Sequence, residues 1–577
     1  MTKTAESAIL RAALAQCRPH FIAAAAFSAL VNLLYIAPTL YMLQVYDRVV
    51  PTRGMQTLLF LTMVLLFALA TLALLDRVRA RLLVRAGIRL DTILAPRILD
   101  ATLGQPDLPT ARQALRDFDT MRAGLTGPAV LALFDAPWMP IYILVCFLVH
   151  PAIGGVAILG CAILPLLAWA NERHTRARLD RAQAIASGSY ASQDALLSAA
   201  DSVRALGMRR ALVARQLRQR EAMLTAQTEA SFAGGSFLTA TKFTRMALQS
   251  LALGLGALLA VNNQISGGAI FASSFLIARA LAPIEQLIGT WRTIVQARQS
   301  QANLAELLAG PAQTMIPTQL PPPRGALTLE GLTVLNDARD GAILGGISIA
   351  IQPGELIAIV GPSGAGKSTL ARAIAGALTP DRGVVRIDGA DTRDWDPERL
   401  ARHIGYLPQD SALFAGTVGE NIARFSGETG GDRATIDAAV VAAAEKVGAD
   451  PLIRHLSQGY DHRLGLGGRG ISAGQAQRIA LARAVFGDPA LLVLDEPNAH
   501  LDAEGDAALV AALGALKADG KTILIVSHKL GILPVVDRIL VLRDGRVALF
   551  GPRDEVLPKI APPPPTRRVI QQPASKA

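Results

Sequence analysis

The first half of the chain contains uncharged stretches that are longer than an ordinary core helix. Residues 21–46, 57–75 and 136–171 contain no Asp, Glu, Lys or Arg. About 20 helical residues cross the ~30 Å hydrocarbon core of a bilayer, so the first two stretches each predict one membrane span. The third is long enough to cross twice, with a reversal near His150 and Pro151. The hydrophobic content of 51% is high for a soluble enzyme and agrees with this interpretation.

A further uncharged stretch, residues 246–277, is interrupted at Asn262-Asn263 and at Gly267-Gly268. We interpret it as a fifth span and the start of a sixth. The sequence therefore predicts a membrane α-helical bundle of six spans.

Arginines are concentrated beside the predicted spans. Residues 173–220 hold ten arginines and three acids, whereas the short links near His150 and Asn262 hold no Lys or Arg. By the positive-inside rule, this basic segment, residues 76–127 and both termini are predicted to be cytoplasmic. The formal net charge of +11 is then mostly a topology signal. Neither aromatic interleaving nor a binding motif accompanies the arginines, so we expect no nucleic-acid partner.

A glycine-rich run, GPSGAGKST, directly follows the apolar run LIAIV in the second half of the chain. This is the P-loop pattern, in which successive backbone N–H groups surround phosphates, Lys367 reaches the β/γ oxygens and the Ser368 hydroxyl binds Mg²⁺. On its own, the motif predicts only a nucleotide-binding fold. The predicted nucleotide-binding residues are Gly361, Pro362, Ser363, Gly364, Ala365, Gly366, Lys367, Ser368 and Thr369.

A proline-rich segment, residues 310–325 (GPAQTMIPTQLPPPRG), separates the two halves, because helix cannot continue through it. The helix that leaves the membrane is predicted at residues 291–308. The predicted organisation is a cytoplasmic N-terminal segment (1–20), a transmembrane domain with cytoplasmic helical extensions (21–309), a linker (310–325), a nucleotide-binding domain (326–558) and a disordered tail (559–577).

Two acids close a second apolar run, LLVLDEP. Asp495 is predicted to hold Mg²⁺ through water, and Glu496 is predicted to accept a proton from, or to orient, the water that attacks the γ-phosphate. Adjacent acids are common on surfaces, but the preceding LLVL run argues against a solvated pair.

Two further polar residues follow apolar runs. Gln409, in YLPQD, is predicted to sense the metal and the attacking water, and His528, in ILIVSHK, to reach the γ-phosphate. A single Gln in a loop is more often structural. A single His also carries little weight, but its order after Asp495 favours the functional interpretation.

A third motif, ISAGQAQR, precedes a predicted helix. The hydroxyl of Ser472, with Gly474, Gln475 and the helix N-terminus, is predicted to form an anion site. The structural alternative is that Ser472 simply caps the helix.

Together and in this order, the motifs resemble the nucleotide-binding domain of ABC transporters over residues 326–558. The resemblance implies an α/β P-loop fold and a head-to-tail dimer of these domains. ATP then lies between residues 361–369 of one domain and residues 472–475 of the other. One chain holds a single copy of each motif, so the working unit is expected to be a homodimer. Residues 498–502 (NAHLD) match the family's loop that communicates between the two sites.

The chain departs from the family pattern at two places. Ala473 stands where the family usually has a second glycine in its signature motif, which places a methyl group near a phosphate-binding backbone. Residues 333–340 contain no aromatic residue where many members stack the adenine base.

Three segments resemble the type I secretion ATPases, in the branch that exports metalloproteases: YMLQVYDRVVPTRGMQTLL (41–59), LFDAPWMPIYILVCFLVHP (133–151) and GDPALLVLDEPNAHLDAEG (487–505). The resemblance implies a multi-pass protein of the bacterial inner membrane, in contact with membrane lipids, with a cytoplasmic nucleotide domain. It implies ATP-driven export of an unfolded polypeptide cargo, with a periplasmic membrane-fusion protein and an outer-membrane channel protein as partners.

Three other functions are weighed against secretion. A lipid or drug exporter shares the fold and motifs but works without the two partner proteins. A non-transporting membrane ATPase is disfavoured by intact Lys367, Glu496 and His528. A soluble ABC protein would contain two nucleotide domains and no spans, which this sequence excludes.

Three charged residues lie at or near membrane depth. An ionisable group costs about 2.5–3.5 kcal/mol at the centre of a spanning helix, so it normally faces a cavity or a partner. For Asp135 and Glu285 we expect salt bridges or positions near the membrane surface. For Arg279 we expect a position facing the pore or its entrance.

Overall fold

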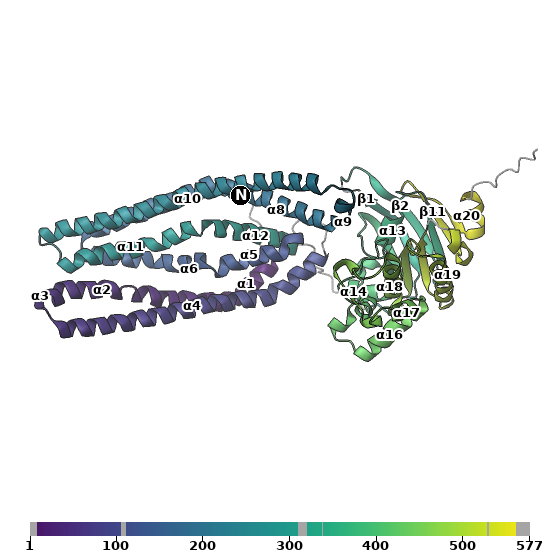
Figure 1. Ribbon diagram of the computed structural model, residues 1–577, viewed down its shortest axis with the longest axis horizontal. Coiled ribbons are helices and arrows are strands. Elements are labelled where there is room, and N and C mark those ends of the chain that lie inside the picture. Colours follow the sequence, from purple (N-terminus) through teal and green to yellow (C-terminus); the bar gives the residue numbers. More distant parts are fainter. Residues whose placement is uncertain (1–7, 105–110, 310–319, 337, 528–529, 561–577) are drawn as a thin grey trace, which may run out of the picture. The chain divides into compact units, whose positions relative to one another are not determined.

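The computed structural model describes residues 8–104, 111–309, 320–336, 338–527 and 530–560 (Figure 1). The chain forms two compact units, residues 1–312 and residues 313–577, and each is described by itself. Most of the predicted linker, residues 310–319, lies outside the described residues. The predicted tail begins inside helix α20 (Arg553–Ile560), and the remainder of the tail also lies outside them.

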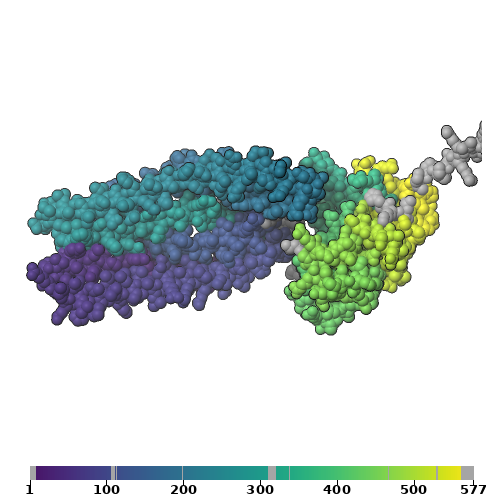
Figure 2. Space-filling model, viewed as in Figure 1, coloured from purple at the N-terminus to yellow at the C-terminus, as the bar shows by residue number. Residues whose placement is uncertain are grey.

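Unit 1 consists of helices. In chain order they are α1 (Ala8–Leu34), α2 (Ala37–Gln44), α3 (Val50–Thr52), α4 (Met55–Gly104), α5 (Ala114–Thr126), α6 (Pro128–Asp135), α7 (Met139–Val149), α8 (Pro151–Ser198), α9 (Ala200–Ala205), α10 (Arg209–Val261), α11 (Gly267–Gly289) and α12 (Trp291–Leu308). Helices α8 and α10 pack along each other on one side of the unit, and α1 and α4 do so on the other (Figures 1 and 2).

Among the described residues of this unit, six helical segments are long and apolar enough to cross a membrane. They are Ala8–Thr52, Met55–Gly104, Ala114–Val149, Pro151–Leu197, Arg209–Val261 and Gly267–Gly289. The predicted count of six is therefore confirmed. On α4, Leu66 and Phe67 are 60% and 75% exposed, as expected for side chains that face hydrocarbon.

The two predicted reversals are also confirmed. α7 ends at Val149 and α8 begins at Pro151, where a missing N–H costs the first turn nothing. His150 between them accepts a hydrogen bond from the Ala152 N–H through its ring Nδ1 (3.2 Å). α10 ends at Val261, and the next helix begins at Gly267. The helix predicted at residues 291–308 is α12.

The first span is not one regular α-helix. α1 ends at Leu34, and a π-helical turn, Val45–Val49, follows α2. Asp47 in this turn accepts hydrogen bonds from the Gly268 N–H (2.7 Å) and from the Ser266 hydroxyl, at the start of α11. A carboxylate at a helix N-terminus pairs with unbonded N–H groups and with the helix dipole. The break therefore presents Asp47 to α11.

A buried polar network joins α1, α4, α6 and α7. The guanidinium of Arg79, whose side chain is 7% exposed, donates to Asp135 (2.8 Å) and to the Ser28 hydroxyl (2.9 Å). The Asn32 amide donates to the same Asp135 oxygen (2.7 Å), and the Tyr142 hydroxyl donates to the Asn32 carbonyl (2.6 Å). Asp135 therefore forms the salt bridge that the sequence led us to expect.

The other two membrane-depth charges also have partners. Glu285 pairs with Arg245 at 2.6 Å, which confirms the expected salt bridge. The guanidinium carbon of Arg279 lies 3.2 Å from the centre of the Tyr35 ring, a cation–π contact between α11 and the end of the first helix. The pore-facing position of Arg279 stays a prediction.

Unit 2 contains the strands. A six-stranded sheet has the order β12 (Arg546–Pro552), β11 (Arg538–Arg543), β3 (Leu356–Val360), β10 (Thr522–Val526), β9 (Leu491–Asp495) and β6 (Ile404–Leu407). All of its neighbouring pairs are parallel except β11 with β12. Every residue of β9 and β10 is buried, which is why these strands are continuous apolar runs.

The remaining strands form smaller sheets. A four-stranded antiparallel sheet has the order β2 (Ala342–Ile351), β1 (Leu327–Leu335), β4 (Arg382–Ile387) and β5 (Ala390–Asp391), and β7 (Gly416–Thr417) pairs with β8 (Arg463–Leu464). The helices are α13 (Lys367–Ile374), α14 (Pro397–His403), α15 (Val418–Ile422), α16 (Arg433–Lys446), α17 (Asp450–Arg454), α18 (Ala473–Val485), α19 (Ala503–Ala518) and α20. Buried apolar clusters cover both faces of the six-stranded sheet, so this unit is an α/β domain.

Asp135→Ala is expected to destabilise unit 1, because it removes a carboxylate that pairs with the buried guanidinium of Arg79. Breaking a buried ion pair costs about 3–5 kcal/mol, and we expect the lower end because half-exposed Asp76 still pairs with Arg79. The measurement is the thermal unfolding midpoint of the purified protein in detergent. Glu172→Ala, which removes only the exposed pair with Arg176, should change it little. Equal midpoints for Asp135→Ala and wild type would contradict this role.

Candidate active site

The phosphate loop connects β3 to α13. Gly361 and Gly366 both have positive φ, +156° and +92°. A Cβ at Gly361 would lie 2.2 Å from the Leu542 carbonyl oxygen, and one at Gly366 would lie 2.6 Å from a methyl of Leu344. Only glycine fits both positions, so the spacing of these residues in the motif has a direct steric cause.

Lys367 begins α13 and folds back over the loop. Its ammonium donates to the carbonyl oxygens of Gly361 (3.0 Å) and Pro362 (2.9 Å). Burial lowers the pKa of this lysine, and the nearby carboxylates of Glu496 and Asp495 oppose that shift. The cation is therefore held at the loop, where phosphate oxygens can replace the carbonyl oxygens as its acceptors.

The two acids follow one another at the end of β9. Asp495 is the last residue of the strand and is 1% exposed. Glu496 has a left-handed backbone, with φ of +50°, which costs a non-glycine residue about 1–3 kcal/mol. Its N–H donates to the Val526 carbonyl of β10 (2.9 Å), which fixes the turn. This left-handed turn places the Glu496 carboxylate beside the loop that follows β6.

Gln409 reaches this carboxylate. Its amide nitrogen lies 3.4 Å from a Glu496 carboxylate oxygen, although the two residues are 87 positions apart in the chain. They meet because β6 and β9 are parallel neighbours, with Leu407 paired to Leu494. The structure thus places Lys367 near Asp495 and Glu496, and Gln409 against Glu496; their roles in catalysis and metal binding stay predictions.

Sequence reasoning missed Gln477. This residue of α18 is 1% exposed, and its amide donates to the Glu496 carbonyl (3.3 Å) and accepts from the Ser411 hydroxyl. It therefore connects the helix of the third motif to both the Gln409 loop and Glu496. The available signal was a glutamine on the apolar face of a helix, because such a residue needs buried partners.

Ser472, Gly474 and Gln475 lie at the start of α18. The Ser472 hydroxyl accepts from the Gln475 N–H (3.3 Å), and the Gln475 side chain accepts from the Ser472 N–H (2.9 Å). Ser472 therefore caps α18, and the predicted anion site at this helix N-terminus stays a prediction. Among the described residues, no hydrogen bond joins these three residues to the phosphate loop. A Cβ at Gly474 would lie 2.9 Å from the His500 carbonyl oxygen, so this helix closely approaches the NAHLD segment.

Comparisons with known proteins decide the family. Residues 344–499 match the ABC transporter family and residues 21–281 match the ABC transporter transmembrane region. The chain is 42% identical to the type I secretion system ATP-binding protein PrsD of Rhizobium meliloti (strain 1021), over 96% of this chain and 95% of that protein. The chain belongs to the type I secretion ABC transporters. The transporter therefore couples ATP hydrolysis to transport and is a multi-pass membrane protein.

Two other similarities agree with membership of this family. The transporter is 30% identical to the cyclolysin secretion/processing ATP-binding protein CyaB of Bordetella pertussis, over 92% of this chain and 75% of that protein. A solved structure of a bacterial Atm1-family ABC exporter with ATP bound superposes with a TM-score of 0.82 at 24% identity, covering 94% of this chain and 96% of that one. The predicted ABC exporter fold is therefore confirmed.

The ATP site of the transporter offers oxygen donors for a divalent cation. Ser368 contributes a hydroxyl, Asp495 a buried carboxylate and Gln409 an amide oxygen, and such hard donors suit Mg²⁺. Among the described residues, no group of three or more His, Cys, Asp or Glu side chains forms a metal cage. His528 lies outside the described residues.

Lys367→Ala is expected to weaken ATP binding by the transporter about tenfold to a hundredfold, because a charge-assisted contact to phosphate is lost. Equilibrium binding of a fluorescent ATP analogue to the purified protein measures this. Lys446→Ala is the control, because its ammonium pairs with Asp488 and Asp519 at the surface. Unchanged affinity in Lys367→Ala would remove this lysine from the site.

Proposed function

We propose that the transporter exports unfolded polypeptides from a bacterial cell as the inner-membrane ATPase of a type I secretion system. The observation that carries the proposal is 42% identity to a type I secretion ATP-binding protein across nearly the full length of both chains. A second relative, 28% identical over 94% of this chain and 76% of that protein, is the toxin RTX-I translocation ATP-binding protein of Actinobacillus pleuropneumoniae.

The working unit in this proposal is a homodimer with two composite ATP sites. Each chain has one phosphate loop and one Ser472–Gln475 segment, and the described residues of one chain do not bond these to each other. A second copy that faces the first head to tail supplies the missing half of each site. Residues 498–502, next to Gly474, then communicate between the two sites.

We assign the hydrolytic roles as follows. Mg²⁺, held by Ser368, Asp495 and Gln409, would neutralise charge on the β- and γ-phosphates. Glu496 orients the attacking water and takes its proton. Gln409, whose amide nitrogen lies 3.4 Å from a Glu496 carboxylate oxygen, positions the same water. We also assign to His528 the contact with the γ-phosphate that the sequence predicted. ATP binding closes the dimer and hydrolysis reopens it, so the energy of ATP enters as different affinities for the two states.

The proposal includes the surroundings of the transporter. We place the nucleotide domain, residues 326–558, and the arginine-rich helical extensions in the cytoplasm, by the positive-inside rule. The partners are a periplasmic membrane-fusion protein, an outer-membrane channel protein and the secreted polypeptide, with membrane lipids around the spans. Together they would form one passage from cytoplasm to exterior.

Glu496→Gln is expected to retain ATP binding and to lose hydrolysis by about 10²–10⁴-fold, because the proton acceptor is removed while shape is kept. The export test co-expresses the transporter with its fusion protein, channel and a candidate cargo, and measures cargo in the medium. We expect cargo outside the cell only with wild type. Lipid- or drug-stimulated ATP hydrolysis, with cargo retained inside, would favour a lipid or drug exporter and overturn the proposal.

Arg279→Ala tests the predicted pore-facing position. We expect export of cargo to fall at equal amounts of transporter, because a cation near the passage is lost. Arg176→Ala, an exposed arginine on α8, is the matched control and should export normally. Wild-type export by Arg279→Ala would leave its contact with Tyr35 as a purely structural one.

A further inference from the structure

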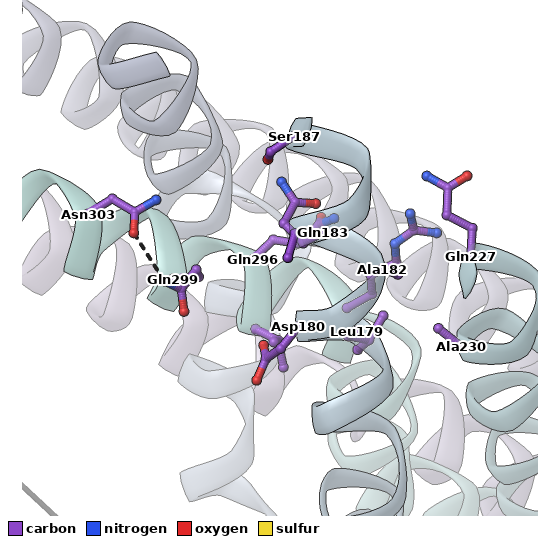
Figure 3. Close-up of a pocket in the computed structure, with 13 residues that line it drawn as sticks. Leu179, Asp180, Ala182, Gln183, Ser187, Gln227, Ala230, Gln296, Gln299 and Asn303 are labelled. Atoms are coloured by element: carbon purple, nitrogen blue, oxygen red, sulfur yellow. Dashed lines mark hydrogen bonds between the residues drawn. The ribbon is translucent and has the colours of Figure 1, made fainter. Parts of the chain in front are cut away.

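A cavity of about 350 Å³ lies in unit 1 among α8, α10 and α12 (Figure 3). Its size is at the lower end of the range for ligand sites in proteins. On α8, Gln183 lies twelve residues beyond the end of the uncharged stretch at Asn171, which is roughly 18 Å of helix. The cavity therefore belongs to the helical extensions that we propose are cytoplasmic, outside the hydrocarbon.

Carboxamides dominate the polar lining of this cavity. They come from all three helices: Gln183 on α8, Gln227 on α10, and Gln296, Gln299 and Asn303 on α12. The last three have spacings of three and four residues, so they share one helix face. Asp180, Gln183 and Ser187 repeat this spacing on α8. The polar faces of α8 and α12, together with Gln227 of α10, line one cavity, which distinguishes these amides from isolated surface glutamines.

Some of these amides are oriented by the protein and others are available to a ligand. Asn303 donates to Asp117 of α5 (2.9 Å) and accepts from Gln299 (3.0 Å), so its side chain is held in place. Within the described part of the chain, the side chains of Gln183, Gln227 and Gln296 make no hydrogen bond with the protein. Their donors and acceptors can therefore bind a molecule in the cavity.

The other lining residues limit the chemistry of that molecule. One acid, Asp180, and one base, Arg292, leave the lining without net charge, which does not favour phosphates or nucleotides. Ala182, Ala184 and Ala230 are small, so a chain can approach the helices closely. The apolar contacts and neutral amides suit a ligand that alternates donors and acceptors.

We propose that this cavity binds the main chain of an extended polypeptide segment before it enters the membrane. Each residue of an unfolded chain offers one N–H and one C=O, whatever its side chain. A carboxamide can donate to one and accept from the other. Binding through amides therefore holds many sequences, which an exporter of unfolded chains requires. This inference rests on the proposed function and deepens it, because it assigns a cargo-contact site.

The test uses the full-length transporter in nanodiscs and a fluorescein-labelled peptide as probe, whose Gly and Ser side chains carry no charge and which has no fixed structure. Free fluorescein is the control for binding through the dye. Fluorescence anisotropy measures its affinity for wild type and for Gln183→Ala/Gln296→Ala. We expect the double variant to bind the peptide about tenfold more weakly, with unchanged basal ATP hydrolysis. Alanine is a better helix former than glutamine, so loss of fold does not explain such a result.

Two variants serve as comparisons. Gln193→Ala/Gln286→Ala changes two exposed glutamines outside the cavity and should bind the peptide like wild type. Gln296→Glu keeps the side-chain shape but removes both donors, so it should also weaken binding. The export assay is run on all variants at equal protein levels, and the cavity variants should release less cargo into the medium.

The outcomes separate this inference from the proposed function. Peptide affinity and export equal to wild type in the double variant would overturn the cavity assignment and leave secretion intact. The assignment would also be overturned if the double variant kept its peptide affinity but changed its oligomeric state, because the glutamines would then contact a second copy of the chain. If wild type exports no cargo but binds the peptide through these amides, the cavity assignment stands and the secretion proposal falls.

Discussion

The parallel pairing of β9 with β6 and β10 determines where the chemistry of the nucleotide domain lies. Parallel strands end at one edge of a sheet, so the loops after β3, β6 and β9 open on the same side. The register pairs Asp495 with Val526 and Leu407 with Leu494, which sets Glu496 opposite the loop of Gln409. A slip of one residue would turn Asp495 to the other face of the sheet. The buried apolar side chains that fix this register therefore also fix the active site.

Much of the fold could be predicted because its physical causes are local. A spanning helix must lack charge over its own length, and a phosphate loop needs glycine at fixed positions, so both are visible in short segments. Gln409 and Glu496 could each be assigned to the attacking water because each follows an apolar run, whereas their contact depends on the parallel pairing of β6 with β9. The capping box at Ser472 depends on residues three positions apart.

The rest depends on which helices pack together, and the sequence does not reveal this. Asp135 could be expected to have a partner, but only the packing of α1, α4 and α6 selects Arg79 and Asn32. Gln477 lies inside the ISAGQAQR motif, but its importance appears only when the Glu496 carbonyl lies beside it. The break after Leu34 was missed because an uncharged stretch carries no sign of where its hydrogen bonding changes.

The left-handed backbone of Glu496 sets stability against activity at a single residue. Glycine adopts this conformation freely, so replacement by glycine would relax the turn and strengthen the fold. It would also remove the carboxylate next to Gln409. Selection for thermal resistance alone would therefore favour an inert protein, whereas selection for a working cycle retains the strain. Variants selected for stability without an activity screen should therefore be checked first for replacement of Glu496.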